Sequence, residues 1–328
     1  MLLSRTADHL YWHARYIERA ENTARMLHVN TQLALLPRDE AVHRESWQAM
    51  LRLFELEGDF AARYGAPQPQ AVIHYMARDA DNPSSIYACL RACRENARAV
   101  RGSLTTELWE TINLTWLTML RDLEDGVLER SPEQFFEWIK HRAHLVRGVT
   151  ENTMLVDEAL HFMRLGSQLE RADNMARMLD VRFHEHEAMA PGGKPGAAQG
   201  KALDTDAGEF YRWSAILGCV SALEVYRKVY RDVVTPSRVV ELLVLNATLP
   251  SSLVALMRGV KDNLARVANG RSAETERQAG LLLAELEYGR IEDILRGPGL
   301  HRFLTNFLAR VNHLGTRIGR DFLLPLSA

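Results

Sequence analysis

A twelve-residue segment occurs twice in this chain of 328 residues. Residues 18–29 return as residues 170–181, and nine of the twelve positions are identical. A second, weaker pair of matching segments begins at Pro83 and at Pro250, in the same order along the chain. Repetition of helical segments is typical of duplicated or stacked helical architectures. The chain is therefore predicted to consist of two related halves.

The separation between the two copies changes along the chain and locates an insertion. It is 152 residues for the first pair of segments and 166 residues for the matching segments that begin at Trp47 and Trp213. Before Trp213 the chain has a run rich in Gly, Pro and Ala, which predicts a flexible loop at about 189–203. We place the first helical half at 1–150 and the second at 151–328, and we expect them to share one core.

Apolar residues recur at spacings of three and four along almost the whole chain, and no strand pattern interrupts them. Asn82-Pro83 is a predicted helix start, with an N-cap side chain followed by proline at the first helical position. The expected fold is all-α, a multi-helix bundle built from two tandem pseudo-repeated halves. Helices are predicted at about 4–36, 39–64, 70–80, 83–101, 104–129, 132–147, 153–188, 204–234, 236–248, 250–269, 272–296 and 299–323.

The composition excludes several classes of protein. The net charge of -2 offers no overall electrostatic attraction to nucleic acid or to an anionic membrane. The first residues carry charges where a signal peptide has an apolar run, and no stretch approaches the roughly 20 apolar residues of a membrane span. Cys89, Cys93 and Cys219 suit packing better than a disulfide framework. We expect a cytoplasmic protein.

The repeated segment places carboxylates within an apolar helical face. On a helical wheel Glu21 falls inside the stripe that contains Ile17 and Ala24, so it should be at least partly buried. Asp173 occupies the same place in the second copy. A buried carboxylate must find a partner or become neutral. The nearest candidates are Arg25 and Arg177, each four residues further along its helix.

Two interpretations of this constellation remain open. In the first, the repeats meet through buried ion networks that fix their register. In the second, they form a polar pocket in which arginines hold a substrate carboxylate or phosphate while a carboxylate acts on a proton or an amine. The catalytic candidates would be Glu18, Glu21, Glu170 and Asp173, and the substrate-binding candidates Arg15, Arg19, Asn22, Arg25, Arg171, Asn174 and Arg177.

The weaker repeat supplies secondary candidates. Its serines are expected to cap helix starts, with anion binding there as the alternative. Its arginines are expected to form pairs at a spacing of four, Arg91 with Glu95 and Arg258 with Asp262. The secondary site candidates are Ser84, Ser85, Arg91, Glu95, Asn96, Ser251, Ser252 and Arg258.

No complete cofactor motif is present. Glu158 and His161 form one Glu-x-x-His pair, but a di-metal bundle requires two. The run of residues 184–186, His-Glu-His, is interpreted as a solvated helix end. We expect no metal and no other cofactor. The chain has no phosphate-binding loop, nucleophile elbow or dinucleotide fingerprint, which argues against a self-sufficient ATP-using or covalent enzyme.

Several segments, spread over nearly the whole chain, resemble landmarks of the bacterial Alpha-E family, an all-helical domain of long-undefined function. They are residues 1–12 (MLLSRTADHLYW), 15–25 (RYIERAENTAR), 94–98 (RENAR), 107–110 (ELWE), 154–158 (MLVDE), 165–166 (LG) and 169–173 (LERAD). Departures occur at His9 and His13 and at residues 246–248, where the family usually has other residues.

The resemblance implies a partner more clearly than a reaction. Family members are typically encoded beside circularly permuted ATP-grasp proteins and often beside transglutaminase-like proteins, which implies chemistry on peptide-like amide bonds. No established catalytic residues carry over. We expect an accessory or substrate-presenting protein that works with an ATP-grasp ligase and possesses no nucleotide chemistry of its own. The alternative is a stand-alone amide-forming or amide-cleaving enzyme with its site at the junction of the repeats. A homo-oligomer is compatible with either.

Overall fold

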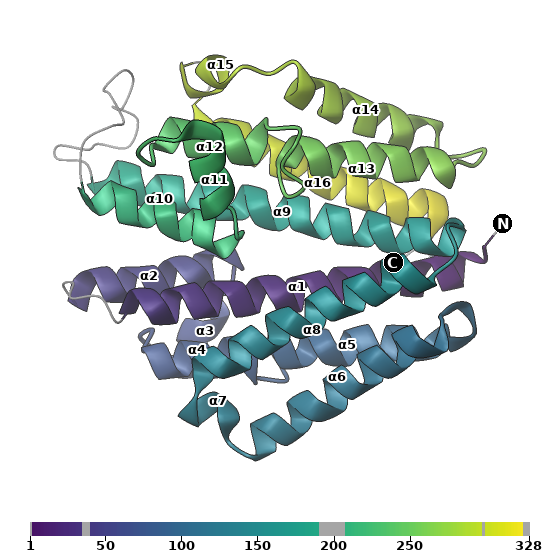
Figure 1. Ribbon diagram of the computed structural model, residues 1–328, viewed down its shortest axis with the longest axis horizontal. Coiled ribbons are helices and arrows are strands. Elements are labelled where there is room, and N and C mark those ends of the chain that lie inside the picture. The colour runs from purple at the N-terminus through teal and green to yellow at the C-terminus, as the bar shows by residue number, and fades with distance from the viewer. Residues whose placement is uncertain (1, 35–39, 190–206, 297–298, 324–328) are drawn as a thin grey trace. The chain divides into compact units, whose positions relative to one another are not determined.

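The computed structural model describes residues 2–34, 40–189, 207–296 and 299–323. Helices connected by turns make up this part of the chain, and it contains no strand (Figure 1). The all-α prediction is confirmed, whereas the tandem pseudo-repeat stays a prediction. Residues 190–203 of the loop predicted at about 189–203, and the side chains of residues 184–186, lie outside the described residues.

The chain divides into two compact units. Unit 1 comprises Met1–Glu170 together with the C-terminal residues from Phe322, and unit 2 comprises Arg171–Asp321. The boundary falls inside the long helix α9, Glu158–Met189. These units are defined by packing and not by sequence similarity, so the predicted halves 1–150 and 151–328 stay a prediction.

Unit 1 is built around its first helix. Helix α1 packs against α5 and α8, and α6 packs against both of those helices (Figure 1). The apolar stripe of α1 is fully buried, with Leu10, Ala20, Ala24 and Leu27 inaccessible to solvent. The elements are α1 (Ser4–Ala34), α2 (Glu40–Leu53), α3 (Glu57–Tyr64), α4 (Pro69–Ala77), α5 (Ile86–Ala99), the 3-10 turn η1 (Arg101–Ser103), α6 (Thr106–Glu124), α7 (Val127–Arg130), α8 (Pro132–Thr153) and the first part of α9.

Unit 2 continues α9 and adds shorter helices. Helix α12 packs against α10, α11, α13 and α15, and α13 packs against α14. The core includes Leu242, Leu243 and Val260, which are fully buried. The elements are α10 (Ala207–Cys219), α11 (Leu223–Tyr230), α12 (Pro236–Val244), α13 (Leu253–Arg266), α14 (Ala273–Glu287), α15 (Ile291–Arg296) and α16 (Leu300–Phe322).

Four predicted helices are each interrupted, so those predictions were wrong in extent. The predicted helices 39–64, 104–129 and 204–234 break near Glu55, Gly126 and Ser221, where φ is 59°, 69° and 53°. A left-handed backbone cannot continue a right-handed helix. The fourth, 272–296, ends at Glu287 and resumes at Ile291.

The predicted start at Asn82-Pro83 was three residues early. Helix α5 begins at Ile86, because the Ser85 hydroxyl accepts a hydrogen bond from the backbone N–H of Ala88 at 3.0 Å and caps the helix. Ser252 caps α13 in the same way, at 3.2 Å from the nitrogen of Ala255. The capping role predicted for these serines is confirmed at Ser85 and Ser252. Ser84 and Ser251 lie in the turns that precede the two helices.

The two capping hydroxyls also donate hydrogen bonds. Ser85 donates to the carbonyl of Asp79 at 2.6 Å, and Ser252 donates to the carbonyl of Asn246 at 2.7 Å. Each hydroxyl therefore already has a donor and an acceptor partner. They act in helix capping, and neither needs a bound anion for its hydrogen bonds.

Helix α9 approaches α1 at a glycine within unit 1. A Cβ atom at Gly166 would overlap the carbonyl oxygen of Tyr11 and lie 3.1 Å from its carbonyl carbon. Both neighbouring atoms belong to backbone, which cannot move aside as a flexible side chain can. Gly166 is therefore required for the helices to come this close.

The cysteines and a neighbouring histidine are buried. Cys89, Cys93 and Cys219 are buried and form no disulfide, which confirms the prediction of packing in place of disulfides. The His13 Nδ1 lies 3.2 Å from the carbonyl oxygen of Cys93 and 3.1 Å from its Sγ. Its Nε2 is buried and has no hydrogen-bond partner in the described part of the chain. Burial lowers the pKa of His13 from 6.5 to about 4.

Acidification should therefore destabilise the protein through His13. Between pH 6.5 and about 4 the unfolded chain binds a proton that the folded protein excludes. The free energy of unfolding should fall by about 3 kcal/mol as pH falls across that window. Urea unfolding at several pH values would measure this loss, and His13→Gln should reduce it. An unchanged pH dependence in His13→Gln would contradict the assignment.

None of the described helices combines the length and apolar character needed to cross a bilayer.

Candidate functional site

Two carboxylates of the first repeat copy lie on one face of α1. Glu18 and Glu21 are three residues apart, which places them nearly one helical turn from each other. Each is 5% exposed. The predicted burial of Glu21 is confirmed, and Glu18 is equally buried.

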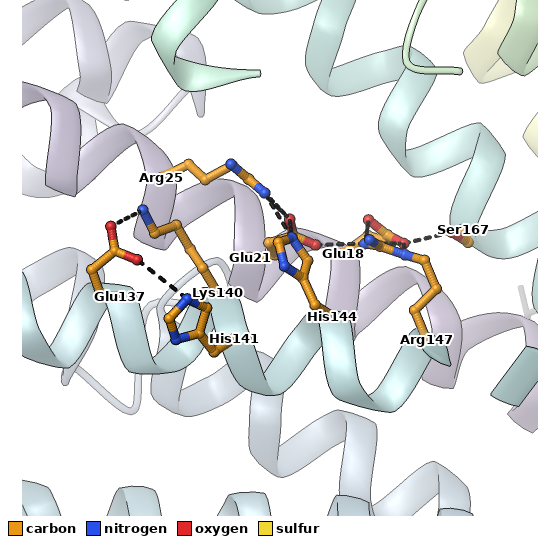
Figure 2. Close-up of polar contacts among 9 residues, drawn as sticks. All are labelled: Glu18, Glu21, Arg25, Glu137, Lys140, His141, His144, Arg147 and Ser167. Atoms are coloured by element: carbon orange, nitrogen blue, oxygen red, sulfur yellow. Dashed lines mark hydrogen bonds and ion pairs between the residues drawn. The ribbon is translucent and has the colours of Figure 1, made fainter. Parts of the chain in front are cut away.

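Arg147 of α8 joins the two carboxylates (Figure 2). Its Nη2 donates to both Glu18 oxygens at 2.9 Å and to Glu21 Oε2 at 2.5 Å. The Ser167 hydroxyl of α9 adds a hydrogen bond to Glu18 Oε1 at 2.6 Å. Side chains from two other helices, α8 and α9, therefore converge on the carboxylates of α1, and the 35% exposed Arg147 lies between the cluster and solvent.

The other oxygen of Glu21 has two further partners. Arg25 donates to Oε1 from Nε at 2.8 Å and from Nη2 at 2.6 Å, which confirms the predicted pairing at a spacing of four. The His144 Nε2 lies 3.1 Å from the same oxygen and 2.8 Å from Arg25 Nη2. His144 is 47% exposed and forms the outer edge of the cluster.

These contacts keep Glu21 ionised. Burial alone would raise its pKa, but the hydrogen bond from His144 and the charges of Arg147 and Arg25 outweigh burial and hold the pKa well below its usual range. The same contacts act on Arg147, since burial would lower its pKa and the charges of Glu18 and Glu21 raise it. Charged partners thus stabilise each other on the inner side of α8.

A second cluster surrounds Glu170, which is 2% exposed. Arg15 Nε donates to Glu170 Oε2 at 2.6 Å, and Arg19 Nε donates to Oε1 at 2.7 Å. Burial would raise the pKa of Glu170, but the two guanidinium groups lower it. Arg15 also donates to the Tyr11 hydroxyl at 3.1 Å and stacks 5.1 Å from the Trp12 ring.

The remaining residues of the second copy lie in unit 2. Arg177 Nε donates to Asp173 Oδ2 at 2.8 Å, which confirms the pair predicted at a spacing of four. Arg171 and Asn174 are partly exposed. That Glu21 and Arg25 approach Asp173 and Arg177 stays a prediction. In the first copy, Asn22 is also partly exposed, and its Nδ2 has no hydrogen-bond partner among the described residues.

The family model for Alpha-E matches residues 2–323, and its description is a predicted alpha-helical domain with a conserved ER motif. The chain belongs to the Alpha-E family. This Alpha-E protein contains a Glu-Arg dipeptide in both copies of the twelve-residue segment, Glu18-Arg19 and Glu170-Arg171. The ion pair between Arg19 and Glu170 joins one dipeptide to the other. No curated protein and no solved structure was found to match the Alpha-E chain.

Two arginines among the secondary candidates of the Alpha-E protein, Arg91 and Arg258, have different partners from those predicted. Glu95 accepts from Arg94 at 2.9 Å and from Arg98 at 2.6 Å, so the predicted pair with Arg91 was wrong. The Arg91 guanidinium lies over the Tyr87 ring, at 5.7 Å. The Tyr87 ring one turn back offers Arg91 a stacking surface, and Arg98 reaches Glu95 from the following turn.

Arg258 and Asn96, two further secondary candidates, also bind residues of other helices. Arg258 pairs with Glu287 of α14 at 2.8 Å, so its predicted pairing with Asp262 was wrong. The tertiary partner replaces the local one because α13 and α14 pack side by side. Asn96 accepts a hydrogen bond from His9 at 2.8 Å and ties α5 to α1.

Glu158 belongs to the one Glu-x-x-His pair considered as a metal site, and it makes a structural contact. Glu158 accepts a hydrogen bond from the backbone nitrogen of Leu2. Within the described part of the Alpha-E chain, no three His, Cys, Asp or Glu side chains are grouped so that they could hold a metal ion.

Sequence reasoning missed the residues of α8 that complete the first cluster. His144 and Arg147 are spaced by three, as are Glu18 and Glu21, but the two pairs are more than 120 residues apart in the chain. The sequence signal that could have identified them is the equal spacing of an acidic pair on one predicted helix and a basic pair on another. Figure 2 also shows a separate group on α8, in which Lys140 donates to Glu137 at 2.7 Å.

Proposed function

We propose that this chain is a non-catalytic accessory protein that works with an ATP-grasp amide or peptide ligase and presents substrate to it. The observation that carries the proposal is the saturation of the motif carboxylates by arginines. Glu18, Glu21 and Glu170 each accept hydrogen bonds from guanidinium groups. Three of these groups, those of Arg147, Arg15 and Arg19, lie on a different helix from the carboxylate that they bind. Their arrangement is suited to holding helices together.

The same contacts disfavour the enzymatic alternative. A general acid must carry a proton near the working pH, and the pKa values of Glu21 and Glu170 are lowered. A general base needs an accessible oxygen, and the oxygens of both carboxylates already accept hydrogen bonds. Arg15, Arg19, Arg25 and Arg177 are likewise paired with carboxylates of this chain. A Glu/Asp/Arg/Asn site for amide chemistry would require these pairs to open.

The proposed partner follows from the family and from the motif content of the chain. Alpha-E proteins are typically encoded beside circularly permuted ATP-grasp proteins, and this chain has no phosphate-binding loop of its own. The ligase would therefore supply ATP binding and acyl activation. A transglutaminase-like protein would be a second partner, acting on the amide bonds so formed.

Co-expression with the ATP-grasp protein encoded beside this chain tests the proposal. We expect a complex that co-elutes in size-exclusion chromatography and releases ADP with amino-acid or peptide acceptors faster than the ligase alone. The isolated chain should neither release ADP nor cleave peptide amides. Failure to form a complex, or amide turnover by the isolated chain, would contradict the proposal.

Glu21→Gln separates the accessory role from the enzymatic one. The substitution leaves Arg25 without its carboxylate and weakens the contact of Arg147. We expect the free energy of unfolding to fall by about 2 kcal/mol, because partial exposure of Arg147 moderates the loss of a buried pair. Ligase activity per folded complex should persist. A variant with unchanged stability and no activity would favour the enzyme.

The matched control is Glu129→Gln. Glu129 pairs with Arg78 at 2.9 Å, and both side chains are exposed. This carboxylate-to-amide change should alter the free energy of unfolding by less than about 1 kcal/mol.

A further inference from the structure

One side of α5 carries a row of arginines. Arg91, Arg94 and Arg98 follow one another at spacings of three and four, and Arg101 continues the row in η1. Arg91, Arg98 and Arg101 are exposed, and Arg94 is partly exposed. Because the whole chain has a net charge of -2, this row is a local concentration of positive charge.

Only one carboxylate is paired with the row in the described part of the chain. Glu95 lies between Arg94 and Arg98, at 2.9 and 2.6 Å from their nitrogens. Arg91 and Arg101 have no carboxylate within ion-pair distance among the described residues. Four positive charges and one negative charge leave the row strongly basic.

Aromatic rings hold these guanidinium groups in place. Arg91 lies 5.7 Å from the centre of the Tyr87 ring, and Arg101 lies 5.3 Å from that of Trp109 on α6. Arg94 lies 6.0 Å from the same Trp109 ring. Stacking orients a guanidinium group while leaving its N–H donors able to bind a carboxylate. The donors are therefore partly ordered before any partner arrives.

Contacts between α5 and α6 keep the rings and arginines together. Arg94 Nε donates to Asn113 Oδ1 at 2.8 Å, and Tyr87 packs 5.2 Å from Trp116. The two helices lie side by side (Figure 1). Further along α6, Leu114 and Leu117 are half exposed. Exposed apolar surface is therefore present on α6, the helix that packs against α5.

We propose that this surface, the α5–α6 face, binds an acidic segment of a partner protein. The face consists of Arg91, Arg94, Arg98, Arg101, Trp109, Leu114 and Leu117. Carboxylates of the segment would pair with the arginines, and its apolar side chains would pack on the leucines. Glu107 and Glu110 flank Trp109 in the sequence of α6 and are exposed, so they would repel carboxylates of the segment from that part of α6.

The inference rests on the proposed accessory role, because it names the face through which the ligase docks. Arg91→Glu combined with Arg101→Glu tests it without removing an ion pair within the chain. In the co-expressed complex, the dissociation constant should rise at least about tenfold, and its salt dependence should decrease. Biolayer interferometry at two salt concentrations measures both quantities.

The matched control is Arg290→Glu combined with Arg302→Glu. Both residues are exposed arginines of unit 2, so the net charge changes equally. The control should bind within about twofold of the parent protein, a difference well below one tenfold step in affinity. The melting temperatures of both variants should match the parent. A complex that forms equally well with both variants would overturn the α5–α6 face as the docking surface.

A second probe separates this inference from the proposed function. A fluorescein-labelled peptide of ten residues, rich in glutamate with interspersed leucine, should bind the isolated chain and lose affinity only in Arg91→Glu/Arg101→Glu. If the ligase does not bind but the peptide does, the accessory role fails and the α5–α6 face stands. Absence of peptide binding, equal loss in the control variant, or tighter binding of labelled single-stranded RNA would each overturn the inference.

Discussion

Gly166→Ala is expected to lower the free energy of unfolding by about 4 kcal/mol. The added Cβ would overlap the carbonyl oxygen of Tyr11, and both atoms are held by helical backbone. The overlap can be removed only if α1 and the first part of α9 move apart. That movement would also stretch the hydrogen bonds of Glu18 and Glu170, which span the same pair of helices. Urea unfolding measured by circular dichroism would give the loss.

Gly148→Ala is the matched control. Gly148 lies within α8, and a Cβ there would meet nothing within 4 Å. Removing the conformational freedom of glycine should raise the free energy of unfolding by about 0.5 kcal/mol or more. If Gly166→Ala behaved like Gly148→Ala, the close approach of α1 and α9 would be wrong.

Glu170→Gln is expected to cost about 3 to 5 kcal/mol. Gln keeps the size of the side chain, but it leaves Arg15 and Arg19 partly buried without the carboxylate that neutralises them. The free-energy cost of leaving a buried charge without its partner is much larger than the stabilisation that the intact ion pair provides. Thermal or urea unfolding near pH 7 would measure the loss.

The pH dependence of Glu170→Gln provides a second test. The pKa of Glu170 in the folded protein lies below 4.5, so its stabilising effect is present above pH 4.5 and is lost as pH falls through the lowered value. The variant should therefore lose less stability than the parent in strong acid. This loss begins at pH 4.5, whereas that of His13 begins at pH 6.5, which allows the two contributions to be separated. Equal stability of parent and variant at pH 7 would contradict the buried ion cluster.

The helix that carries the first motif could be predicted closely from sequence. Its apolar stripe has a regular helical period, and the burial of Glu21 follows from its position within that stripe. The pairs Glu21 with Arg25 and Asp173 with Arg177 also follow from local spacing, because one helical turn determines both distances. Local geometry was sufficient for these features.

The partners from other helices could not be predicted in this way. Arg147, His144 and Ser167 reach α1 only after α8 and α9 have packed against it, and nothing in their own segments indicates that contact. The same limit explains the wrong pairing of Arg258, whose tertiary partner replaced the local one. Breaks at Glu55 and Ser221 were missed because a left-handed residue other than glycine has little sequence signal.

The buried cysteines have a practical consequence. Burial raises the pKa of Cys89 to about 12 and also raises that of Cys93, so in the folded protein neither thiol is a ready nucleophile. An alkylating reagent can modify these two thiols only when α5 unfolds locally or separates from its neighbours. It can reach Cys219 only when the same happens to α10. The rates of alkylation at these positions, followed by mass spectrometry, would report the opening of unit 1 and of unit 2 separately in the unmodified chain.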